Sequence, residues 1–262
     1  MLGVRLFVRK VRHVELTPNG QTYFPVLRDA FSRISDATRV IVDLHTEDIL
    51  TIQVYSTFTI RWLIPRIPNF EKEHPQLQLR LNTAQSDVDF RSSDVDACIM
   101  IGRPDRQELH FEHLFACELF PLCSPSYLQE HGPFDSPHDL ADATLLQVYP
   151  SADDWPHWLG QNGVDGVDLR EGTQFDSYDL ALSGAMQGLG IALGQQPYVD
   201  RDLHSGMLVE MFPDRRVDNP GDWYLACRRE SRDQAKIRTF SEWIQSEVAA
   251  DPSLAHLRSA VG

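Results

Sequence analysis

The chain has 262 residues with 42% apolar and 24% charged side chains, and its formal net charge is −14. This composition is ordinary for a soluble globular protein of one or two compact units. No stretch reaches the ~18 uninterrupted apolar residues that a membrane span requires, and no cleavable leader is found. We therefore expect a cytoplasmic protein without a membrane partner.

Basic side chains gather at the start of the sequence. Residues 1–16 hold four basic side chains and one acidic one, which leaves a net charge of −17 on the rest of the chain. Neutralisation of phosphate requires clustered Lys and Arg. The first stretch is therefore predicted to contact DNA, and the remainder to repel it. The four basic residues are Arg5, Arg9, Lys10 and Arg12.

The spacing of cysteines and histidines argues against a disulfide framework or a metal site. The four cysteines have no CxxC spacing, so we expect them to be reduced and mostly buried. The closest histidines, His110 and His113 in "HFEH", fall on a predicted strand, where an odd and an even position point to opposite faces. We expect neither a metal nor a cofactor. The cysteines are Cys98, Cys117, Cys123 and Cys227.

A long helix is predicted after the basic stretch, over residues 18–48. Thr17 followed by Pro18 is a favourable helix start, because the hydroxyl caps free amides and proline suits the first helical position. Apolar or small residues then recur at alternating spacings of four and three, which is typical of a two-stranded coiled coil. We expect a homodimer or homotetramer, and the alternative is that this stripe packs on the chain's own body. The stripe consists of Tyr23, Leu27, Ala30, Ile34, Ala37, Ile41 and Leu44.

Strands and helices alternate over the remaining residues. Predicted strands at 50–56, 77–83 and 96–102 are separated by loops and by "TFTIRWLIPRIPNFEKEHP", a helix bent by its prolines. This order predicts parallel pairing in an open α/β sheet. The same pattern starts again near "LFPLCSPSYLQEH", so two lobes are expected. "WYLACRR" and the last helix are predicted to complete the first lobe.

Two strand-to-helix junctions carry polar side chains. "VYSTFT" (54–59) and "QFDSYD" (174–179) each end a strand and begin a helix, where free amides and the positive end of the helix dipole suit a small ligand. If the lobes face each other, both junctions line one cleft. The alternative for each junction is plain helix capping. The candidate residues are Ser56, Thr57, Phe58 and Thr59 at the first junction, and Asp176, Ser177 and Tyr178 at the second.

Common enzyme signatures are missing. "GLGIALG" (188–194) places its glycines after a predicted helix instead of before one, which favours a helix C-cap that leads into a strand. The phosphate-loop, nucleophile-elbow and metalloprotease patterns are not found, so no enzymatic activity is expected. The acidic pairs Asp87 with Asp89 and Asp153 with Asp154 are interpreted as solvated surface charge.

The ordered set of motifs resembles the LysR-type transcriptional regulators. "LGVRLFVRKVRHVELTPNGQTYF" is similar to the wing that ends the winged helix-turn-helix of that family. "WLIPRIPNFEKEHPQLQLRL", "LCSPSYL", "DWPHWL", "GAMQGLGIAL" and "DLHSGMLVEMF" follow in family order, to about residue 249. Trp155 and Trp158, together with "FDSYD", look most like the branch that includes the glycine-cleavage and β-lactamase regulators.

The resemblance implies a DNA-binding regulator whose effector domain has two Rossmann-like lobes of the periplasmic-binding-protein type. The effector is expected to be an amino acid or another small carboxylate. Arg103, after a predicted strand end, is added as a partner for an anion, because Arg binds carboxylates well. The effector contacts that the resemblance implies are Ser56, Thr57, Ser177, Tyr178 and, near the return crossover, Tyr224.

The resemblance also implies a division of the chain. A solute-binding protein with the same two lobes and no DNA function is the alternative, and the basic wing and the missing export signal argue against it. The sequence begins after the place of the recognition helix, so most of the helix-turn-helix is expected to be missing and the wing to contact phosphates with little base readout. The expected parts are a wing (1–17), a dimerisation helix (18–48), a first lobe (49–120 with 227–249), a second lobe (121–226) and a frayed tail (250–262).

Overall fold

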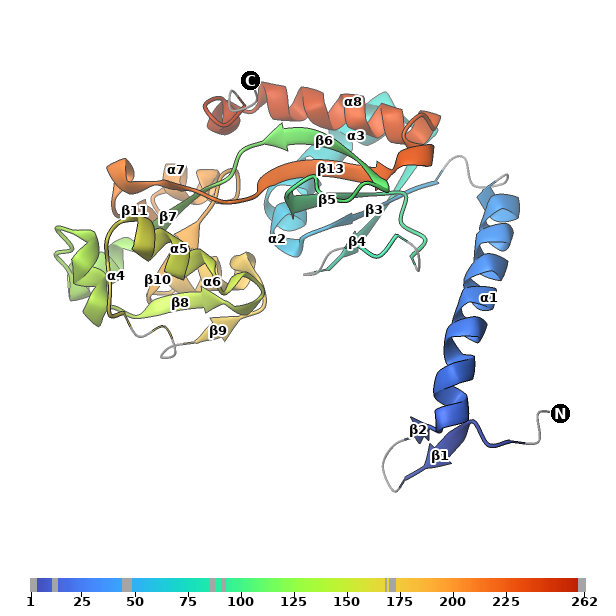
Figure 1. Cartoon of the computed structure of the whole chain (residues 1–262). Helices are drawn as coiled ribbons and strands as arrows, with labels where there is room; N and C mark the ends of the chain where they lie inside the picture. The colour runs from blue at the N-terminus through green and yellow to red at the C-terminus, as the bar shows by residue number, and fades with distance from the viewer. Residues whose placement is uncertain are drawn as a thin grey trace. The chain divides into compact units, whose positions relative to one another are not determined.

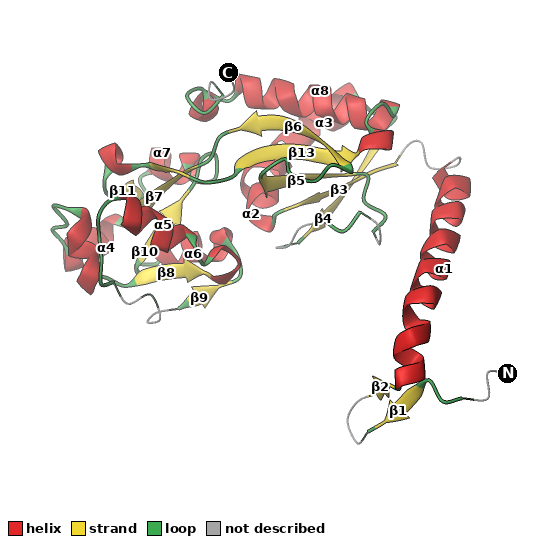
Figure 2. Cartoon of the chain, in the orientation of Figure 1, coloured by secondary structure: helices red, strands yellow, loops and turns green. Residues whose placement is uncertain are grey.

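The computed structural model describes residues 4–10, 14–43, 49–84, 88–90, 93–167, 169 and 173–258. The chain forms two units, Met1–Asp48 with Asp89–Ser93 and Ile49–Val88 with Asp94–Gly262. Both contain helices and strands (Figures 1 and 2). Within the described ranges, no helix is long and apolar enough to cross a lipid bilayer.

The smaller unit begins with a β-hairpin that leads into a long helix. Strand β1 (Phe7–Arg9) pairs antiparallel with β2 (Val14–Leu16), and α1 spans Pro18–Asp43. The predicted helix start is confirmed, because the Oγ1 atom of Thr17 accepts a hydrogen bond from the N–H of Gly20 at 3.0 Å. A Cβ atom at Gly20 would lie 2.1 Å from the carbonyl oxygen of Leu6, so only glycine allows the helix to approach the hairpin so closely.

Helix α1 exposes much of its apolar surface. Tyr23 and Ile34 of the predicted stripe are 36% and 61% exposed, and Leu27 is half-buried. Leu44 lies outside the described residues, as do the side chains of Ala37 and Ile41. Apolar surface exposed along a helix is typical of a face that another helix covers. Further exposed apolar side chains of this helix are Phe24, Val26 and Phe31.

The first lobe of the larger unit is a five-stranded sheet in the order β4-β3-β5-β13-β6. Strand β3 pairs in parallel with β4 and β5, whereas β13 runs antiparallel to β5 and β6. The predicted parallel pairing of the three strands β3, β4 and β5 is confirmed, and so is the prediction that "WYLACRR" completes this lobe. The returning strand β13 joins antiparallel, because it enters the sheet where β5 ends. The bounds are β3 Ile49–Val54, β4 Gln78–Thr83, β5 Ala97–Gly102, β6 Leu109–Phe115 and β13 Asp222–Arg228.

The helical segment after β3 is stepped, as its prolines predict. It runs from α2 (Ser56–Phe58) through a π-helical turn (Thr59–Leu63) and a 3-10 turn (Ile64–Arg66) into α3 (Ile67–Glu73). Helices α3 and α8 (Ala235–Ala250) lie together on one side of the sheet in Figure 1. They are joined by ring contacts of Phe70 with Phe240 and Trp243, at centroid distances of 5.7 and 4.9 Å.

The second lobe is a mixed sheet in the order β11-β7-β10-β8-β9, and β12 also pairs with β7. Parallel pairs join β10 to β8 and β8 to β9, while the pairs made by β7 are antiparallel. Gly188, with φ +78°, follows α6 and precedes β10, which confirms the helix C-cap predicted in "GLGIALG". The bounds are β7 Glu118–Cys123, β8 Leu145–Val148, β9 Gln174–Phe175, β10 Ile191–Gly194, β11 Val209–Glu210, β12 Val217–Asp218, α4 Pro125–His131, α5 Asp154–Gln161, α6 Tyr178–Met186 and α7 Asp200–Ser205. Short 3-10 segments span Pro137–Asp142, Tyr149–Ser151, Pro213–Arg215, Arg229–Ser231 and Pro252–Leu254.

Two crossing segments connect the lobes and bond to each other. The N–H of Asn219, between β12 and β13, donates to the carbonyl of Cys117, between β6 and β7, at 2.7 Å. A Cβ atom at Gly221 would lie 2.9 Å from the Cα of Gly102, so glycine lets the return segment approach β5. The second sheet begins at residue 118, where the lobe boundary was expected at 121, and the first sheet resumes at residue 222, where 227 was expected.

All four cysteines are free and buried, as predicted.

The end of the described chain is packed, so the expectation of a frayed tail is wrong for residues 250–258, and the remaining residues lie outside the described part of the chain. Leu254 and Leu257 are 0% and 3% exposed, and the N–H of Ala116 donates to the carbonyl of Leu257 at 3.0 Å. Buried apolar side chains of this size stabilise a fold by about 1.5–3 kcal/mol each. The tail is consequently part of the first lobe and touches one of the crossing segments.

Asp251 anchors this tail. Its Oδ2 atom accepts hydrogen bonds from Trp62 Nε1 and from Arg66 Nη2, both at 2.7 Å, and its Oδ1 atom accepts from the N–H of Ser253 at 2.9 Å. Burial alone would raise the pKa of Asp251, but the hydrogen bonds from Ser253 and Trp62 and the charge of Arg66 outweigh it and lower that pKa. The ionised form is therefore the one that the folded chain stabilises.

Replacing Asp251 with Asn is expected to lower the free energy of unfolding by about 1–3 kcal/mol at pH 7, because Trp62, Ser253 and the half-buried Arg66 lose a charged acceptor while Arg66 keeps Glu247. Since the folded-state pKa is lowered, this contribution is present above the unfolded pKa of about 4 and is lost as the pH falls through the folded value. Urea unfolding at a series of pH values measures the difference. Asp233→Asn, at an exposed ion pair, serves as control, and an equal loss in both variants would contradict the anchor.

Candidate functional site between the two lobes

A pocket of about 170 Å³ lies between the two lobes of the larger unit. Its walls follow the ends of β3 and β5 in the first lobe and the ends of β8 and β10 in the second. Small molecules bind at this place in open α/β folds, beyond the carboxyl ends of the strands. The lining residues are Tyr55, Thr57, Ile101 and Trp223 from the first lobe, Val148, Pro150, Ser151, Asp154, Tyr178, Gln195 and Tyr198 from the second, and Asn219 from the return crossing.

The structure brings two of the predicted residues together in this pocket. Thr57 and Tyr178 both line it, from opposite lobes, and Thr57 is 3% exposed. Ser56 begins α2 beside them without lining the pocket. Thr59 does not line it either, and its hydroxyl donates to the carbonyl of Tyr55 at 3.0 Å.

Phe58 packs against residues that line the pocket. It is 0% exposed, and its ring stacks on Trp223 with the centroids 4.9 Å apart. The ring of Tyr198, from the second lobe, lies edge-to-face against Trp223 with the centroids 5.9 Å apart. Its centroid lies 6.2 Å from that of the tilted ring of Tyr178. Such ring pairs contribute about 0.5–1.5 kcal/mol each beyond their buried area. The aromatic residues therefore form a continuous wall that spans both lobes.

The other predicted residues of the second junction do not line the pocket. Ser177 is buried and immediately precedes α6, while Asp176 is exposed. The side chain of Ser177 makes no capping hydrogen bond at the start of this helix. The second junction thus supplies one lining side chain, that of Tyr178.

Arg103 and Tyr224 lie away from the pocket. Arg103 is exposed, and its Nε atom donates to the carbonyl of Pro220 at 3.3 Å. The ring of Tyr224 packs edge-to-face against Phe111 and His113, because consecutive residues of a strand point to opposite faces and Trp223 takes the pocket side. Neither side chain is in place to contact a molecule bound among the lining residues.

Asp154 lies in the pocket, so its interpretation as solvated surface charge is wrong. The Tyr178 hydroxyl donates to Oδ2 of Asp154 in a short hydrogen bond. Burial raises the pKa of Asp154, and hydrogen bonds from Tyr178 and Asn219 and the attraction of His157 oppose that rise only in part. Burial and then the charge of Asp154 raise the pKa of Tyr178, which therefore remains a proton donor.

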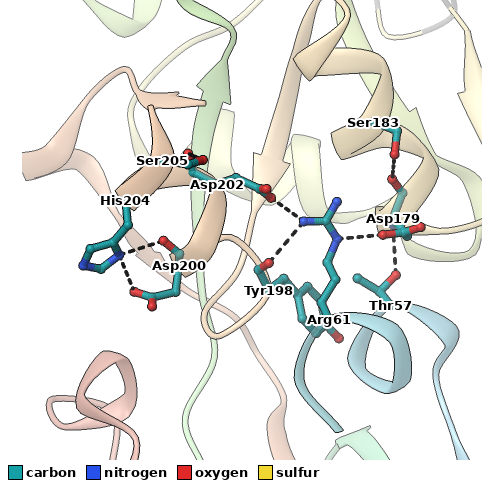
Figure 3. Close-up of polar contacts among 9 residues, drawn as sticks. All are labelled: Thr57, Arg61, Asp179, Ser183, Tyr198, Asp200, Asp202, His204 and Ser205. Carbon is teal, nitrogen blue, oxygen red and sulfur yellow. Dashed lines mark hydrogen bonds and ion pairs between the residues drawn. The ribbon is translucent and has the colours of Figure 1, made fainter. Parts of the chain in front are cut away.

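One guanidinium group joins the two lobes beside the pocket (Figure 3). The Nε atom of Arg61, from the π-helical turn, donates to Oδ1 of Asp179 at 2.7 Å, and its Nη1 atom pairs with Asp202 and with the carbonyl of Tyr198. The side chain of Arg61 is only 13% exposed. Ion pairs at such a depth are weakly screened by salt.

Thr57 takes part in the same contact. Its Oγ1 atom accepts a hydrogen bond from the N–H of Asp179 at 3.0 Å (Figure 3). This amide belongs to the first turn of α6, where free N–H groups were expected to face a ligand. The hydroxyl of the first lobe thus occupies a donor that an anion would otherwise use.

The expected DNA-facing residues lie in the smaller unit. Arg5 and Lys10 are exposed in and beside the hairpin, and Lys10 Nζ lies 2.8 Å from Glu15 Oε2. Arg9 belongs to β1, but its side chain lies outside the described residues, as does the whole of Arg12. A hairpin is present where the resemblance implies the wing, with Phe7 opposite Leu16.

Several residues of the site were not predicted from the sequence. Arg61 pairs with Asp202 across 141 positions, and no local pattern indicates such a pair. Asp154 had a usable signal, because it follows strand β8 and opens helix α5, like the two junctions that were chosen. The lining residues Gln195 and Asn219 follow β10 and β12 in the same way.

The chain is similar in sequence and in structure to known transcriptional regulators. The family model described as the LysR substrate binding domain matches residues 45–249. The glycine cleavage system transcriptional activator of Escherichia coli K12 is 33% identical over 250 residues, which cover 95% of this chain and 81% of the activator. The transcriptional activator AmpR of Pseudomonas aeruginosa is 32% identical over 251 residues, covering 95% and 83%. The effector domain of AmpR from the same organism superposes with a TM-score of 0.67 at 30% identity, over 77% of this chain and 95% of that domain.

Replacing Arg61 with Gln is expected to weaken the contact between the lobes by about 2–4 kcal/mol, because Asp179 and Asp202 are then left as unpaired neighbouring carboxylates. Hydrogen exchange measures this as faster exchange at the starts of α6 and α7, with the sheets unchanged. Arg201→Gln, at an exposed position next to Asp202, is the matched control. Wild-type exchange in the Arg61 variant would show that the guanidinium does not hold the lobes.

Proposed function

The chain belongs to the family of LysR-type transcriptional regulators, and we propose that the pocket between its lobes binds the small molecule that controls its action on DNA. The observation that carries this proposal is the pocket itself, which is lined from both lobes and lies beyond the strand ends. Thr57 and Tyr178 are the proposed contacts from the first and second lobes. Ser56, Ser177 and the other residues expected at the junctions are proposed to position these two.

The proposed mechanism is a shift between two arrangements of the lobes. Thr57 lines the pocket and also accepts the hydrogen bond from Asp179, one turn before Arg61. A molecule that binds Thr57 therefore acts on the segment that holds the lobes together. A ligand shifts such an equilibrium only by its difference in affinity for the two states, and roughly 5.5 kcal/mol moves a population from 1:99 to 99:1.

We further propose that the smaller unit contacts DNA and a second copy of the chain. The basic hairpin suits phosphate contacts through Arg5, Arg9, Lys10 and Arg12. The exposed apolar face of α1 suits pairing with the same helix in a homodimer or homotetramer. The place of action is proposed to be the cytoplasm, and the role to be regulation without enzymatic activity. The relatives, which are named as transcriptional activators, favour this role over that of a solute carrier.

The effector is proposed to be of amino-acid size. A pocket of about 170 Å³ is small beside the roughly 300–1,000 Å³ clefts that hold drug-sized ligands. An amino acid or another small carboxylate was expected from the family resemblance, and an amino acid suits this volume. The lining offers hydroxyls, amides and aromatic rings, so hydrogen bonding and ring contacts would fix its orientation.

Replacing Thr57 with Val is expected to reduce effector binding at least tenfold, because the isosteric side chain loses a hydroxyl in the pocket. Thermal unfolding of the full chain with and without a protein-free bacterial metabolite extract measures binding as a rise in Tm. Thr59→Val, two positions away and outside the pocket, is the control. If the extract leaves the wild-type Tm unchanged, or if both variants respond like the wild type, the proposed effector site is wrong.

Replacing Ile34 with Glu is expected to convert the oligomer to monomers, because a charge is introduced into the apolar face of α1. Analytical ultracentrifugation of the full chain measures its mass in solution. Gln21→Glu adds the same charge outside the predicted stripe and should leave the oligomer intact. A monomeric wild type, or an Ile34 variant that stays oligomeric, would contradict pairing through this helix.

A further inference from the structure

The charge of the pocket lining is negative. Among the described residues that line the pocket, Asp154 has the one carboxyl group, and no Lys, Arg or His is present. The remaining lining side chains are aromatic, aliphatic, hydroxyl or amide groups. A bound molecule would therefore meet a carboxylate and no protein cation.

No Lys or Arg side chain of the described residues pairs with Asp154. Its hydrogen bonds come from Tyr178 and Asn219. The guanidinium of Arg61 is bound to Asp179 and Asp202. Asp154 thus has hydrogen-bond donors and the attraction of His157, which lies outside the pocket lining, but no Lys or Arg partner. A partly buried carboxylate gains from a cation that bonds to it directly.

Two groups that would favour an anion are bonded to other parts of the chain. The amide of Asp179 at the start of α6 is bonded to Thr57. Arg103, which was expected to pair with a carboxylate, is exposed and bonded to Pro220. The pocket therefore offers weak recognition to a molecule whose charge is only negative.

The aromatic wall suits a cation. Tyr55, Tyr178, Tyr198 and Trp223 line the pocket together with Asp154. Ring faces attract ammonium groups by about 0.5–2 kcal/mol, and a carboxylate beside them adds a charge-assisted hydrogen bond. A carboxylate among aromatic rings is thus a favourable site for an organic ammonium ion.

We propose that the effector enters this pocket with a protonated amino group, which Asp154 and the surrounding rings bind, so that amines and amino acids are selected over acids without an amino group. This inference rests on the proposed function, because it names the ligand class of the same pocket. It also reverses the polarity expected from Arg103. The pKa of Asp154, which burial raises, would fall again beside an ammonium group.

The experiment compares three molecules that share one branched alkyl group, using calorimetry and Tm shifts on the full chain. Leucine carries both charged groups, isoamylamine lacks the carboxylate, and isocaproate lacks the amino group. Isoamylamine and leucine should bind at least tenfold more tightly than isocaproate. Asp154→Asn should remove this preference, while Asp153→Asn, which changes the same charge at an exposed position, should keep it. Tyr178→Phe, a second pocket variant, should weaken amine binding if the Asp154 variant does not fold.

The metabolite extract separates the inference from the proposed function. Acetylation of the extract with acetic anhydride neutralises primary and secondary amines and leaves carboxylates charged. The inference expects the treated extract to lose its Tm shift, in contrast to an extract exposed to hydrolysed reagent. An undiminished shift from the treated extract, or isoamylamine binding no better than isocaproate, including no binding by either, would overturn the inference and leave the proposed function standing. No shift from untreated extract would instead refute the proposed function.

Discussion

The larger unit depends on one cation that two carboxylates of the opposite lobe share. Arg61 is nearly buried, and its contacts with Asp179 and Asp202 join a helical turn of the first lobe to the starts of two helices in the second. The same short segment supplies Thr57 to the pocket wall and Phe58 to the core. The residues of the pocket wall, the core and the lobe contact therefore lie on two consecutive helical turns. A shift of this segment would move all three together.

The two crossing segments determine which motions this contact can control. The hydrogen bond from Asn219 to the Cys117 carbonyl ties the crossings to each other, and the packed tail fixes one of them through Leu257. Asn219 also lines the pocket and bonds to Asp154. A bound molecule would thus touch both the lobe contact and one of the segments that connect the lobes, which suits the proposed shift between two arrangements.

Charge links the pocket to the rest of the chain. Outside the basic first residues the net charge is −17, and the pocket lining carries one carboxylate and no Lys, Arg or His. A field of this sign raises the local concentration of cations and lowers that of anions. The acidic composition, which distinguishes the larger unit from the basic hairpin, therefore also bears on which molecules approach the pocket.

Local patterns predicted much of this structure. The Thr17 cap, the stepped helix after β3 and the C-cap at Gly188 each follow from residues that are close in sequence, and the strand ends pointed to Thr57 and Tyr178. Long-range pairing was not predictable in the same way. Arg61 and Asp202 are separated by 141 positions. Alternation along β13 puts Trp223 and Tyr224 on opposite faces, but which of them meets the pocket is set by the pairing of this strand with β5, which is distant in sequence. Asp154 looked like surface charge because Asp153 precedes it, although its place after a strand was informative.

The most direct test of the account is a crystal structure of the full chain grown with the protein-free metabolite extract. The account predicts density for a small molecule between the lobes, in contact with Thr57 and Tyr178, and a change in the Arg61 contact relative to crystals grown without extract. A molecule bound elsewhere while this pocket holds only water, or lobes that are unchanged with the pocket filled, would contradict it.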